Sequence, residues 1–383
     1  MIKAHKIRLH PTPEQAKYFA HAAGTARFVF NWALAEWQKQ YEAGRKPNAR
    51  ALRTQFNAIR REQFPWTYDV SKSVVEGAFM DVGTAFKNFF AGSSGKRKVG
   101  YPHFKSKKRC RPAFYLANDR FTVGDHWIDI SKLGQVNMAE KVRFSGKILS
   151  ARVSKTADWW FVSITVEMPD EVLFNTHPPV GIDVGLNRLA TLNDGRRYEN
   201  QRPLTHHLKK LRQLNKELAR RTRGGKNWQK TESKLGRLHY EIACQRNDVL
   251  HKLTTQIAQT SGMVAVEDLH VKGLIQNRCL SRAFSDAAVG KLLDLLESKV
   301  SHAGGLLIKV GRFYPSSKLC HCCGARRADL TLSDRVFVCP DPACGYVGDR
   351  DENASWNILQ EALYLFGLGQ LNGSSSAVAT TRR

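Results

Sequence analysis

The N-terminal part of the chain changes its hydrophobic period twice. Residues 2–10 alternate apolar and polar side chains, which is the pattern of a half-buried strand. From residue 13 to residue 90 the apolar positions recur every three or four residues, and Thr12 with Gln15 forms a capping-box helix start. Alternation returns over residues 112–168. The pattern predicts a β domain with an inserted helical block, whose helices cover residues 13–42, 49–62 and 71–90.

The C-terminal part alternates strands with long helices and begins after the linker His177-Pro178-Pro179. Its predicted strands cover residues 180–185, 189–192, 263–269 and 306–310. Its predicted helices cover residues 203–222, 226–259, 286–302 and 352–366. Such alternation is typical of a mixed α/β sheet whose functional site lies at the strand ends.

The charge of the chain narrows the class of partner. The 383 residues include 60 Lys and Arg against 34 Asp and Glu, which gives a net charge of +26 and a pI of about 9.9. This excess indicates a polyanionic partner, with nucleic acid first and an anionic membrane surface second. The chain has no long apolar run, and residues 1–6 do not start a signal peptide. We therefore expect no membrane association and a cytoplasmic location, where cysteines stay reduced.

Two cysteine pairs, Cys320 with Cys323 and Cys339 with Cys344, form the most specific motif. Four thiolates in two such knuckles are the ligand set of a tetrahedral structural zinc, and the alternative is a set of unligated thiols. Cys322 lies inside the first knuckle, so the sequence leaves open which sulfurs bind. The remaining cysteines are isolated and are predicted to be buried or incidental thiols: Cys110, Cys244 and Cys279.

Acidic residues occupy comparable settings at three distant places in the chain. Asp183 and Glu267 lie in apolar, strand-like frames, and an acidic turn with Asp349 and Asp351 follows the second cysteine pair. Carboxylates that meet at a basic groove can hold two divalent cations for phosphodiester cleavage. Each acid also has an ordinary explanation: a turn aspartate at Asp183, a solvated strand end or helix cap at Glu267, and a helix cap in the acidic turn. Combined with the cysteines and the charge, the acids favour a three-carboxylate, metal-dependent nuclease site.

Basic residues concentrate in the two predicted helices over residues 203–222 and 226–259. A solvated helical face is the ordinary explanation, but the excess of Lys and Arg over Asp and Glu favours contact with a nucleic-acid backbone. A second basic segment, the loop over residues 92–98, is predicted to be flexible. The cations expected to bind nucleic acid lie at the tip between the two helices: Arg220, Arg221, Arg223 and Lys226.

Together these residues resemble the transposon-associated TnpB family, compact RNA-guided nucleases related to the type V CRISPR effectors. Gly181-Ile182-Asp183-Val184-Gly185 looks like the first RuvC-type motif of the family, and residues 266–269 look like the second. Residues 349–354 look like the third motif, whose acid falls on Asp351. Three further segments also resemble the family. They are the segment that leads into the cysteine ribbon, residues 314–324, a helix motif at residues 246–252, and the opening helix at residues 25–31.

The resemblance implies a fold of the class α/β plus β-barrel. An N-terminal wedge β-barrel would carry an inserted helical recognition module, and an RNase H-like (RuvC) nuclease domain with a zinc ribbon would follow. The expected domains are residues 1–12 and 111–177 for the barrel, 13–110 for the recognition module, 178–318 and 346–366 for the nuclease domain, 319–345 for the target-binding zinc ribbon, and 367–383 for a disordered tail.

The resemblance also implies an activity, the RNA-guided endonucleolytic cleavage of DNA. Asp183, Glu267 and Asp351 would hold two magnesium or manganese ions, and the two cysteine pairs would hold a structural zinc. The partners would be a guide RNA from the transposon end and a double-stranded DNA target that is read by base pairing. The location would be the cytoplasm of a bacterium or archaeon, at the nucleoid.

Two other functions stay open as alternatives. A guided DNA-binding repressor without cleavage would require a disabled site, and the presence of all three acids argues against it. An RNA-independent transposase or resolvase-like enzyme would use the same fold without a tightly held RNA. A zinc-binding structural RNA protein is a more distant possibility because it leaves the three acids unexplained.

The resemblance also implies that the N-terminal half of the chain reads a short duplex motif beside the target. Lys72, Glu76 and Asn118 fall near the positions that do this in relatives. Ser73 and Glu76 depart from the aromatic residue and the amide expected in a close relative. The sequence of the flanking motif therefore stays open.

Overall fold

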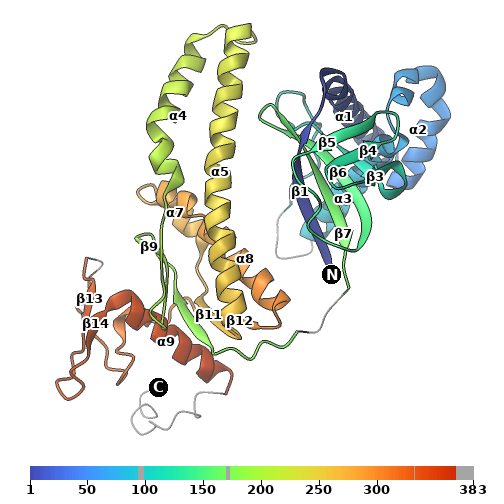
Figure 1. Cartoon of the computed structure of the whole chain (residues 1–383). Helices are drawn as coiled ribbons and strands as arrows, with labels where there is room; N and C mark the ends of the chain where they lie inside the picture. The colour runs from blue at the N-terminus through green and yellow to red at the C-terminus, as the bar shows by residue number, and fades with distance from the viewer. Residues whose placement is uncertain (94–98, 170–172, 332, 368–383) are drawn as a thin grey trace. The chain divides into compact units, whose positions relative to one another are not determined.

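The computed structural model describes residues 1–93, 99–169, 173–331 and 333–367. It divides into two compact units, Met1–Asp170 and Glu171–Arg383, and each has its own sheet and core (Figure 1). Most of the basic loop predicted over residues 92–98, and the predicted tail from residue 368 onward, lie outside the described residues. Among the described helices, none is both long and apolar enough to cross a membrane.

The first unit is built on a seven-stranded antiparallel sheet with the order β2-β6-β7-β1-β5-β4-β3. Its strands are β1 (Ile2–His10), β2 (Ala113–Ala117), β3 (Phe121–Val123), β4 (Trp127–Ile130), β5 (Gly134–Met138), β6 (Lys147–Thr156) and β7 (Trp159–Glu167). The N-terminal strand β1 pairs with β7 and β5, which follow the helical block in the chain. The predicted insertion of helices between the first strand and the others is confirmed.

The sheet is curled, but it is not the closed barrel that the family resemblance implied. β2 and β3 are the two edges of the sheet, yet only the short turn η2 (Asn118–Arg120) separates them in the chain. The sheet must therefore bend until its two edges approach each other at this turn. Within the described ranges, β2 pairs with β6 and β3 pairs with β4, and no ladder joins the edges. Closure needs edge strands that run alongside each other, and β3 has just three residues.

Helices form a second layer and a core of their own. They are α1 (Pro13–Glu42), α2 (Ala49–Gln63), η1 (Pro65–Asp69) and α3 (Lys72–Ser93). α1 begins where predicted, because the Gln15 backbone nitrogen donates to the Thr12 hydroxyl and the Thr12 nitrogen donates back to the Gln15 side chain. Phe19 in the first half of α1 belongs to the sheet core. In the second half, Trp37 stacks on Phe86 of α3 with ring centroids 4.0 Å apart, within the helical core.

The second unit contains a five-stranded mixed sheet with the order β10-β9-β8-β11-β12. Its strands are β8 (Val180–Asp183), β9 (Arg188–Leu192), β10 (Arg197–Glu199), β11 (Met263–Glu267) and β12 (Leu306–Val310). β8, β11 and β12 are parallel, whereas β9 and β10 are antiparallel additions after β8. The mixed sheet predicted from the sequence is confirmed, and two of its central strands end in an acid.

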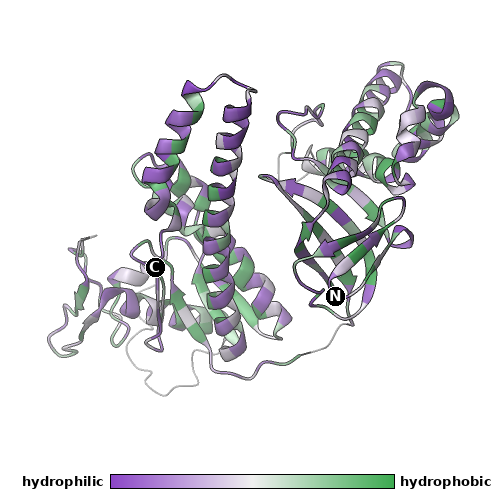
Figure 2. Ribbon diagram, turned by 45° about the horizontal axis from the view of Figure 1, so that its top comes forward, coloured by the Kyte–Doolittle hydropathy of each residue, from purple (hydrophilic) through white to green (hydrophobic). Residues whose placement is uncertain are grey.

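Helices cover both faces of this sheet. α5 (Lys226–Thr260) and α8 (Val289–His302) pack on one face, and α9 (Arg350–Leu365) packs on the other. A Cβ atom on Gly181 of β8 would lie 2.1 Å from the Ser355 carbonyl oxygen of α9, so this close approach requires glycine. Figure 2 shows the strands as mostly hydrophobic ribbon between these layers. The smaller elements before α9 are η3 (Ser316–Lys318), β13 (Val336–Val338) and β14 (Val347–Asp349).

A long antiparallel hairpin of α4 (Pro203–Arg220) and α5 extends from this unit (Figure 1). Leu211 and Leu214 of α4 pack against Leu238 and Ile242 of α5, and most of the remaining residues of the hairpin are hydrophilic (Figure 2). Both helices were predicted with nearly these bounds. The short helices α6 (Val271–Gln276) and α7 (Ser281–Ala287) were not predicted, and the helix expected from residue 286 begins at Val289.

Asp286 fixes the base of the α4–α5 hairpin. Its carboxylate, which is 2% exposed, accepts hydrogen bonds from the backbone nitrogens of Leu204 and Thr205 at 2.9 and 3.1 Å. It also accepts a hydrogen bond at 3.1 Å from the guanidinium of Arg246 on α5. One buried carboxylate thus accepts the hydrogen bonds of the free backbone nitrogens at the start of α4 and also pairs with a cation of α5.

Candidate active site and metal centres

Three elements bring the three predicted acids together. Asp183 is the last residue of β8, Glu267 is the last residue of β11, and Asp351 is the second residue of α9. The parallel register pairs Ile182 with Val266, so Asp183 and Glu267 follow side by side at the same edge of the sheet. Asp183 was expected in the middle of a strand, but it ends one. Because α9 packs directly on β8, its first turn lies beside these strand ends.

The electrostatics of Asp183 reflect this crowding. Its pKa is raised to about 8, first by burial and then by the nearby carboxylates of Glu267 and Asp351, while Arg350 acts in the opposite direction. Crowded carboxylates retain a proton unless a cation balances their charge. A divalent cation with oxygen ligands would remove both the repulsion and the cost of burial. The chemistry of the donor set therefore fits a hard cation.

Asp351 is positioned by the cap of its helix. Asp349 is the N-cap of α9, and its Oδ1 accepts hydrogen bonds from the backbone nitrogens of Asp351 and Glu352 at 2.9 and 3.2 Å. Although burial acts to raise it, the pKa of Asp349 is lowered by its hydrogen bonds from Arg188 and from these backbone groups. The capping role considered for the acidic turn thus belongs to Asp349. The Asp351 carboxylate takes no part in the cap and instead accepts a hydrogen bond from the Arg350 guanidinium at 3.3 Å.

Glu267 is positioned by a hydrogen bond from a serine. The Ser316 hydroxyl donates a hydrogen bond to the Glu267 carboxylate. The Asn357 side-chain nitrogen on α9 donates in turn to the Ser316 carbonyl oxygen at 2.8 Å, and both Ser316 and Asn357 are buried. The helix that carries Asp351 therefore also holds the residue that orients Glu267.

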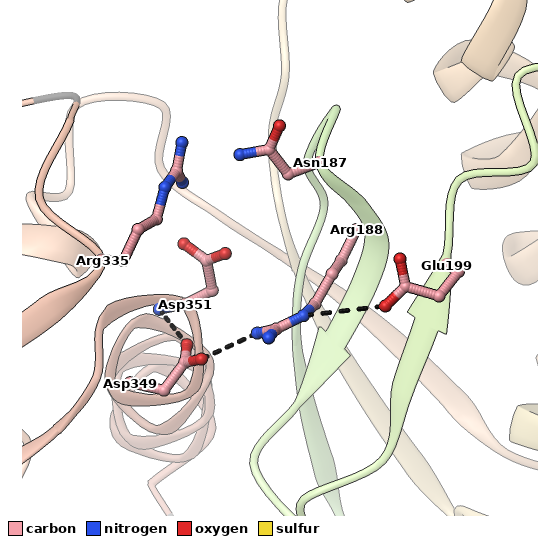
Figure 3. Close-up of a pocket in the computed structure, with 6 residues that line it drawn as sticks. All are labelled: Asn187, Arg188, Glu199, Arg335, Asp349 and Asp351. Atoms are coloured by element: carbon pink, nitrogen blue, oxygen red, sulfur yellow. Dashed lines mark hydrogen bonds and ion pairs between the residues drawn. The ribbon is translucent and has the colours of Figure 1, made fainter.

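A pocket of about 300 Å³ opens beside Asp351. Arg188 spans one side of it, with its guanidinium 2.7 Å from the Asp349 carboxylate and 3.9 Å from Glu199 (Figure 3). Figure 3 shows Arg335 across the pocket from Arg188, and Asn187 above Arg188 at the upper end of the pocket. The pocket thus combines three carboxylates with two guanidinium groups, and guanidinium groups are suited to contact a phosphate.

Four cysteines form a compact cluster. The Sγ atoms of Cys320, Cys323, Cys339 and Cys344 all lie within 4.8 Å of one another. The Cys320–Cys344 and Cys323–Cys339 sulfur pairs are 3.7 and 3.5 Å apart. The edge of a tetrahedron with Zn–S bonds of about 2.3 Å is ~3.8 Å. The cluster therefore has the size and chemistry of a zinc site.

Cys322 lies outside this cluster. It is exposed, its sulfur lies 3.4 Å from Nε2 of His321, and it neighbours Cys320 without being one of the four mutually grouped thiols. The three isolated cysteines are also apart from it, with Cys110 half-buried and Cys244 and Cys279 exposed. Geometry thus separates the two pairs from the other sulfurs, which spacing alone did not do.

The cysteine cluster is joined to α9 on two sides. The strand β14 runs directly into the helix at Asp349. Near the first cysteine pair, Asn353 of α9 accepts a hydrogen bond from the His321 nitrogen at 3.0 Å and donates to the Leu319 carbonyl oxygen at 2.6 Å. The His321 ring also stacks on Trp356 of α9. The ribbon therefore fixes the first turns of the helix that carries the third acid.

The four predicted nucleic-acid-binding cations lie at the tip of the α4–α5 hairpin. Arg220, Arg223 and Lys226 are exposed. Arg221 is half-buried, forms an ion pair with Glu217 and donates to the Asn227 carbonyl oxygen, so it helps to close the tip. Three cations are thus presented to solvent on a rigid two-helix support, and the fourth has a structural role.

The three residues expected near the flanking motif lie in the first unit. Lys72 and Glu76 are in the first two turns of α3, and Asn118 is in the turn after β2, against which α3 packs. Lys72 and Asn118 are exposed. The Glu76 carboxylate is paired with Arg53 at 2.9 Å, so a contact with nucleic acid would have to compete with this ion pair.

Sequence reasoning missed the residues that hold the acids in place. Ser316 lies in the segment that resembles the family's ribbon entry, and that resemblance was its one available signal. Arg188 meets Asp349 across 161 residues of chain, and Asn353 meets His321 across 32. Neither contact leaves a pattern in the sequence, because each depends on how α9 packs against the sheet.

Three segments of the chain match known families. Residues 163–278 match a family described as "Probable transposase", residues 290–358 a "Cas12f1-like, TNB domain", and residues 1–46 a "Helix-turn-helix domain". The first two matches together contain all three acids and the cysteine cluster. In the structure, the segment matched by the third forms the strand β1 and the helix α1.

Two relatives are similar along nearly the whole chain. A protein of Streptomyces pristinaespiralis named "Putative RNA-guided DNA endonuclease" is 32% identical over 369 residues, which are 94% of this chain and 89% of that protein. An Escherichia coli protein of the same description is 29% identical over 390 residues, 97% of this chain and 94% of that protein.

A solved structure shares the fold at low sequence identity. The chain is similar to Cas12f1 in a complex with guide RNA and target DNA, with a TM-score of 0.56 and 15% identity. The similarity covers 91% of this chain and 83% of that one. At this identity the similarity concerns the fold alone.

Proposed function

The chain belongs to the transposon-associated TnpB family of RNA-guided DNA endonucleases, and we propose that it hydrolyses DNA at sites selected by a bound guide RNA and a short flanking motif. The observation that carries the proposal is the meeting of Asp183, Glu267 and Asp351 at one edge of the sheet, where their crowding raises the pKa of Asp183. The net charge of +26 supports nucleic acid as the partner.

The three acids are proposed to bind two magnesium or manganese ions. Carboxylate oxygens are the ligands that these hard cations prefer. Bound there, such a pair supplies an activated water and charge stabilisation for the leaving oxygen of a phosphodiester. Asp183 would release its retained proton if cations bound, while Ser316 would hold Glu267 in orientation and the Asp349 cap would hold Asp351.

The cysteine cluster is proposed to hold a structural zinc. Four thiolates leave no position for a substrate, so the metal would stabilise the fold and take no part in catalysis. Its contribution to the reaction is indirect, because the ribbon contacts α9 through Asn353 and His321 and continues into the Asp349 cap. Loss of the metal is expected to displace Asp351.

The two units are proposed to divide the work of recognition and cleavage. The sheet with acids at its strand ends supports an RNase H-like (RuvC) nuclease domain over residues 178–318 and 346–366, with a target-binding ribbon over residues 319–345. The first unit would supply a recognition module, residues 13–110, and most of a curled wedge domain, residues 1–12 and 111–177, of which residues 171–177 belong to the second unit. Within that unit, Lys72, Glu76 and Asn118 are proposed to face the flanking motif.

The partners are proposed to be a guide RNA from the transposon end and a double-stranded DNA target. Sequence would be read by base pairing between them, while the protein holds the backbones. The exposed cations Arg220, Arg223 and Lys226 support a backbone contact by the α4–α5 hairpin.

A cleavage assay on the natively assembled complex tests the proposal. The protein is purified from cells that express its own transposon ends, and the RNA that copurifies is sequenced. The complex is then mixed with a matching DNA duplex that carries randomised flanking bases, in magnesium or in EDTA. Asp351→Asn removes one proposed ligand, and Asp294→Asn, an exposed acid on α8, is the matched control.

The expected result is magnesium-dependent cleavage next to one flanking motif, which is lost in Asp351→Asn and kept in Asp294→Asn. Bound RNA and DNA without any cleavage would instead indicate a guided repressor. Cleavage or strand transfer without bound RNA would indicate an RNA-independent transposase or resolvase. Cleavage by Asp351→Asn at the rate of the unmodified protein would contradict the assignment of the acids.

A further inference from the structure

Phe313 is an exposed aromatic residue at the rim of the acid cluster. Its side chain is 93% exposed, on the turn that joins β12 to η3. The Tyr314 nitrogen donates to the Gly311 carbonyl oxygen at 3.0 Å, so Arg312 and Phe313 occupy the two corners of a tight turn. The turn therefore presents the Phe313 ring to solvent by its geometry.

Both ends of this turn are attached at Glu267. Before the turn, Val310 is the parallel partner of Glu267, and the Asp268 nitrogen donates to the Val310 carbonyl oxygen at 2.9 Å. After the turn, the Ser316 hydroxyl donates to the Glu267 carboxylate. A short segment with both ends fixed at one acid cannot carry its tip far from that acid. Phe313 is thus placed at the edge of the acid cluster.

The neighbours of Phe313 hold the turn in one orientation. On one side, the Arg312 guanidinium lies 3.4 Å from the Asp268 carboxylate and donates to the Asp268 carbonyl oxygen at 3.3 Å. On the other side, Tyr314 packs against the apolar cluster between the sheet and α9. With its two neighbours turned toward the protein, the ring between them faces outward.

A single exposed apolar side chain needs no special explanation, but a rigidly presented aromatic beside a nuclease site does. Proteins that hold single-stranded nucleic acid stack bases on aromatic rings next to cations that contact the backbone. Here Arg312 lies next to the ring, and the guanidinium-lined pocket lies on the Asp351 side of the acids. A DNA strand that crosses the acids would pass between these two features.

We propose that Phe313 stacks on an unpaired base of the DNA strand and so positions the scissile phosphate against Asp183, Glu267 and Asp351. This inference rests on the proposed nuclease function and adds a positioning residue to it. Stacking is independent of base identity, since every base has an aromatic face, and it suits an enzyme whose target is chosen by a guide. The partner is thus a single strand, because the bases of an intact duplex are already stacked.

Single-turnover cleavage of matched DNA by the guided complex tests this role. Phe313→Ala removes the ring, Phe313→Leu keeps apolar volume without a ring, and Phe313→Trp keeps the ability to stack. Phe174→Ala, at an 85% exposed phenylalanine before β8, is the matched control. Each protein is tested on a series of target strands with one abasic site moved along the region of cleavage.

We expect Phe313→Ala and Phe313→Leu to cleave about 5- to 150-fold more slowly, which corresponds to the ~1–3 kcal/mol of one stacked base. Phe313→Trp and Phe174→Ala should retain the rate. In the unmodified protein one abasic position should cause a similar loss, and that position should cause no further loss in Phe313→Ala. Full activity of Phe313→Leu, or additive losses from the abasic site and Phe313→Ala, would overturn the proposal.

A second measurement does not depend on cleavage. A 2-aminopurine at the sensitive position should lose fluorescence when DNA binds the guided Asp351→Asn complex, and the loss should vanish when Phe313→Ala is added. Absence of this quenching overturns the role of Phe313 even where DNA is bound. Absence of cleavage by the unmodified protein, with quenching retained, contradicts only the nuclease function.

Discussion

Asp349 accepts a hydrogen bond at 2.9 Å from the backbone nitrogen of Asp351, so the cap of α9 fixes the backbone of the third acid directly. The same Asp349 carboxylate is held by Arg188 at 2.7 Å. Asp349, which is not proposed to bind metal, therefore fixes the backbone position of Asp351 and brings the Arg188 charge close to it. This relationship separates two aspartates that lie two residues apart and look alike in the sequence.

Replacement of Asp349 should impair cleavage through the geometry of Asp351. Asp349→Ala removes a helix cap worth about 1 kcal/mol and leaves Arg188 without this partner. A displacement of the Asp351 carboxylate by ~1 Å can slow a reaction by about 100-fold. We expect cleavage to fall by roughly 10- to 100-fold, with a higher magnesium requirement. Asp349→Asn keeps the capping oxygen and should recover most of the activity, and equal loss in both variants would argue against positioning by the cap.

Asp183 should make the metal-free protein less stable as the pH rises. The folded protein keeps the Asp183 proton up to a pKa of about 8, whereas the unfolded chain loses it near 3.8. Unfolding therefore releases a proton between these values, and the free energy of unfolding falls as the pH rises from about 4 to about 8. Asp183→Asn removes this titration, so its excess stability should be absent at pH 4 and reach about 1–3 kcal/mol at pH 8.

Urea unfolding in EDTA at several pH values measures this difference. Addition of magnesium at pH 8 should raise the unfolding midpoint of the unmodified protein and have little effect on Asp183→Asn. A variant that is less stable than the unmodified protein at pH 8 in EDTA would contradict the crowding of the three carboxylates.

Zinc content should distinguish the cysteines of the first knuckle. Cys323→Ser removes one of the four grouped sulfurs, whereas Cys322→Ser changes an exposed sulfur outside the group. We expect about one zinc per chain in the unmodified protein and in Cys322→Ser, and a large loss of zinc in Cys323→Ser. Metal analysis of the purified proteins measures this directly. Retention of zinc by Cys323→Ser together with its loss from Cys322→Ser would reverse the ligand assignment.

Removal of the Asp286 carboxylate should destabilise the nuclease unit. Asp286→Ala leaves the start of α4 uncapped and the partly buried Arg246 without this partner. We expect a loss of about 2–4 kcal/mol in the free energy of unfolding, and a smaller loss for Asp286→Asn, which keeps an acceptor. Asp248→Ala breaks an exposed pair with Lys252 and should cost less than about 0.5 kcal/mol. Chemical unfolding of the three variants measures the series.

The sequence predicted most elements because their signals are local. The alternation of β1 and the capping box at Thr12 need no tertiary information, and both are confirmed. Closure of the first sheet was predicted wrongly, because closure depends on whether β2 and β3 pair, which no local pattern encodes. The short helices α6 and α7 were missed because fewer than two full turns give a weak period.

The candidate metal-binding residues could be predicted from the sequence, but the residues that hold them in position could not. Asp183 is visible as an acid inside an apolar strand-like run and Glu267 as an acid near the end of one, and the cysteine spacing is a known ligand pattern. The roles of these residues stay predictions until cleavage and metal content are measured. Ser316 and Arg188 act through side chains that meet the acids only after α9 has packed on the sheet, so their contacts could not be read from the chain.

The tip of the α4–α5 hairpin should control the salt dependence of RNA binding. Arg220, Arg223 and Lys226 are exposed there, whereas Arg221 is engaged with Glu217. Each lost contact with a phosphate lowers the slope of log affinity against log salt concentration by about 0.7–0.9. Replacement of the three exposed cations by glutamine should therefore lower the slope by roughly 2–3 and weaken binding most strongly at low salt.

A matched triple variant separates this local effect from net charge. Glutamine at Lys39, Lys46 and Arg61, in and beside the helices α1 and α2 of the first unit, removes the same charge from another surface. Binding of the purified guide RNA is titrated between 50 and 300 mM salt for both triple variants. Equal slopes in the two variants would show that the hairpin tip attracts RNA only through the overall charge. A slope lowered by about 1.5 or more for the hairpin variant alone would place at least two phosphates at the tip.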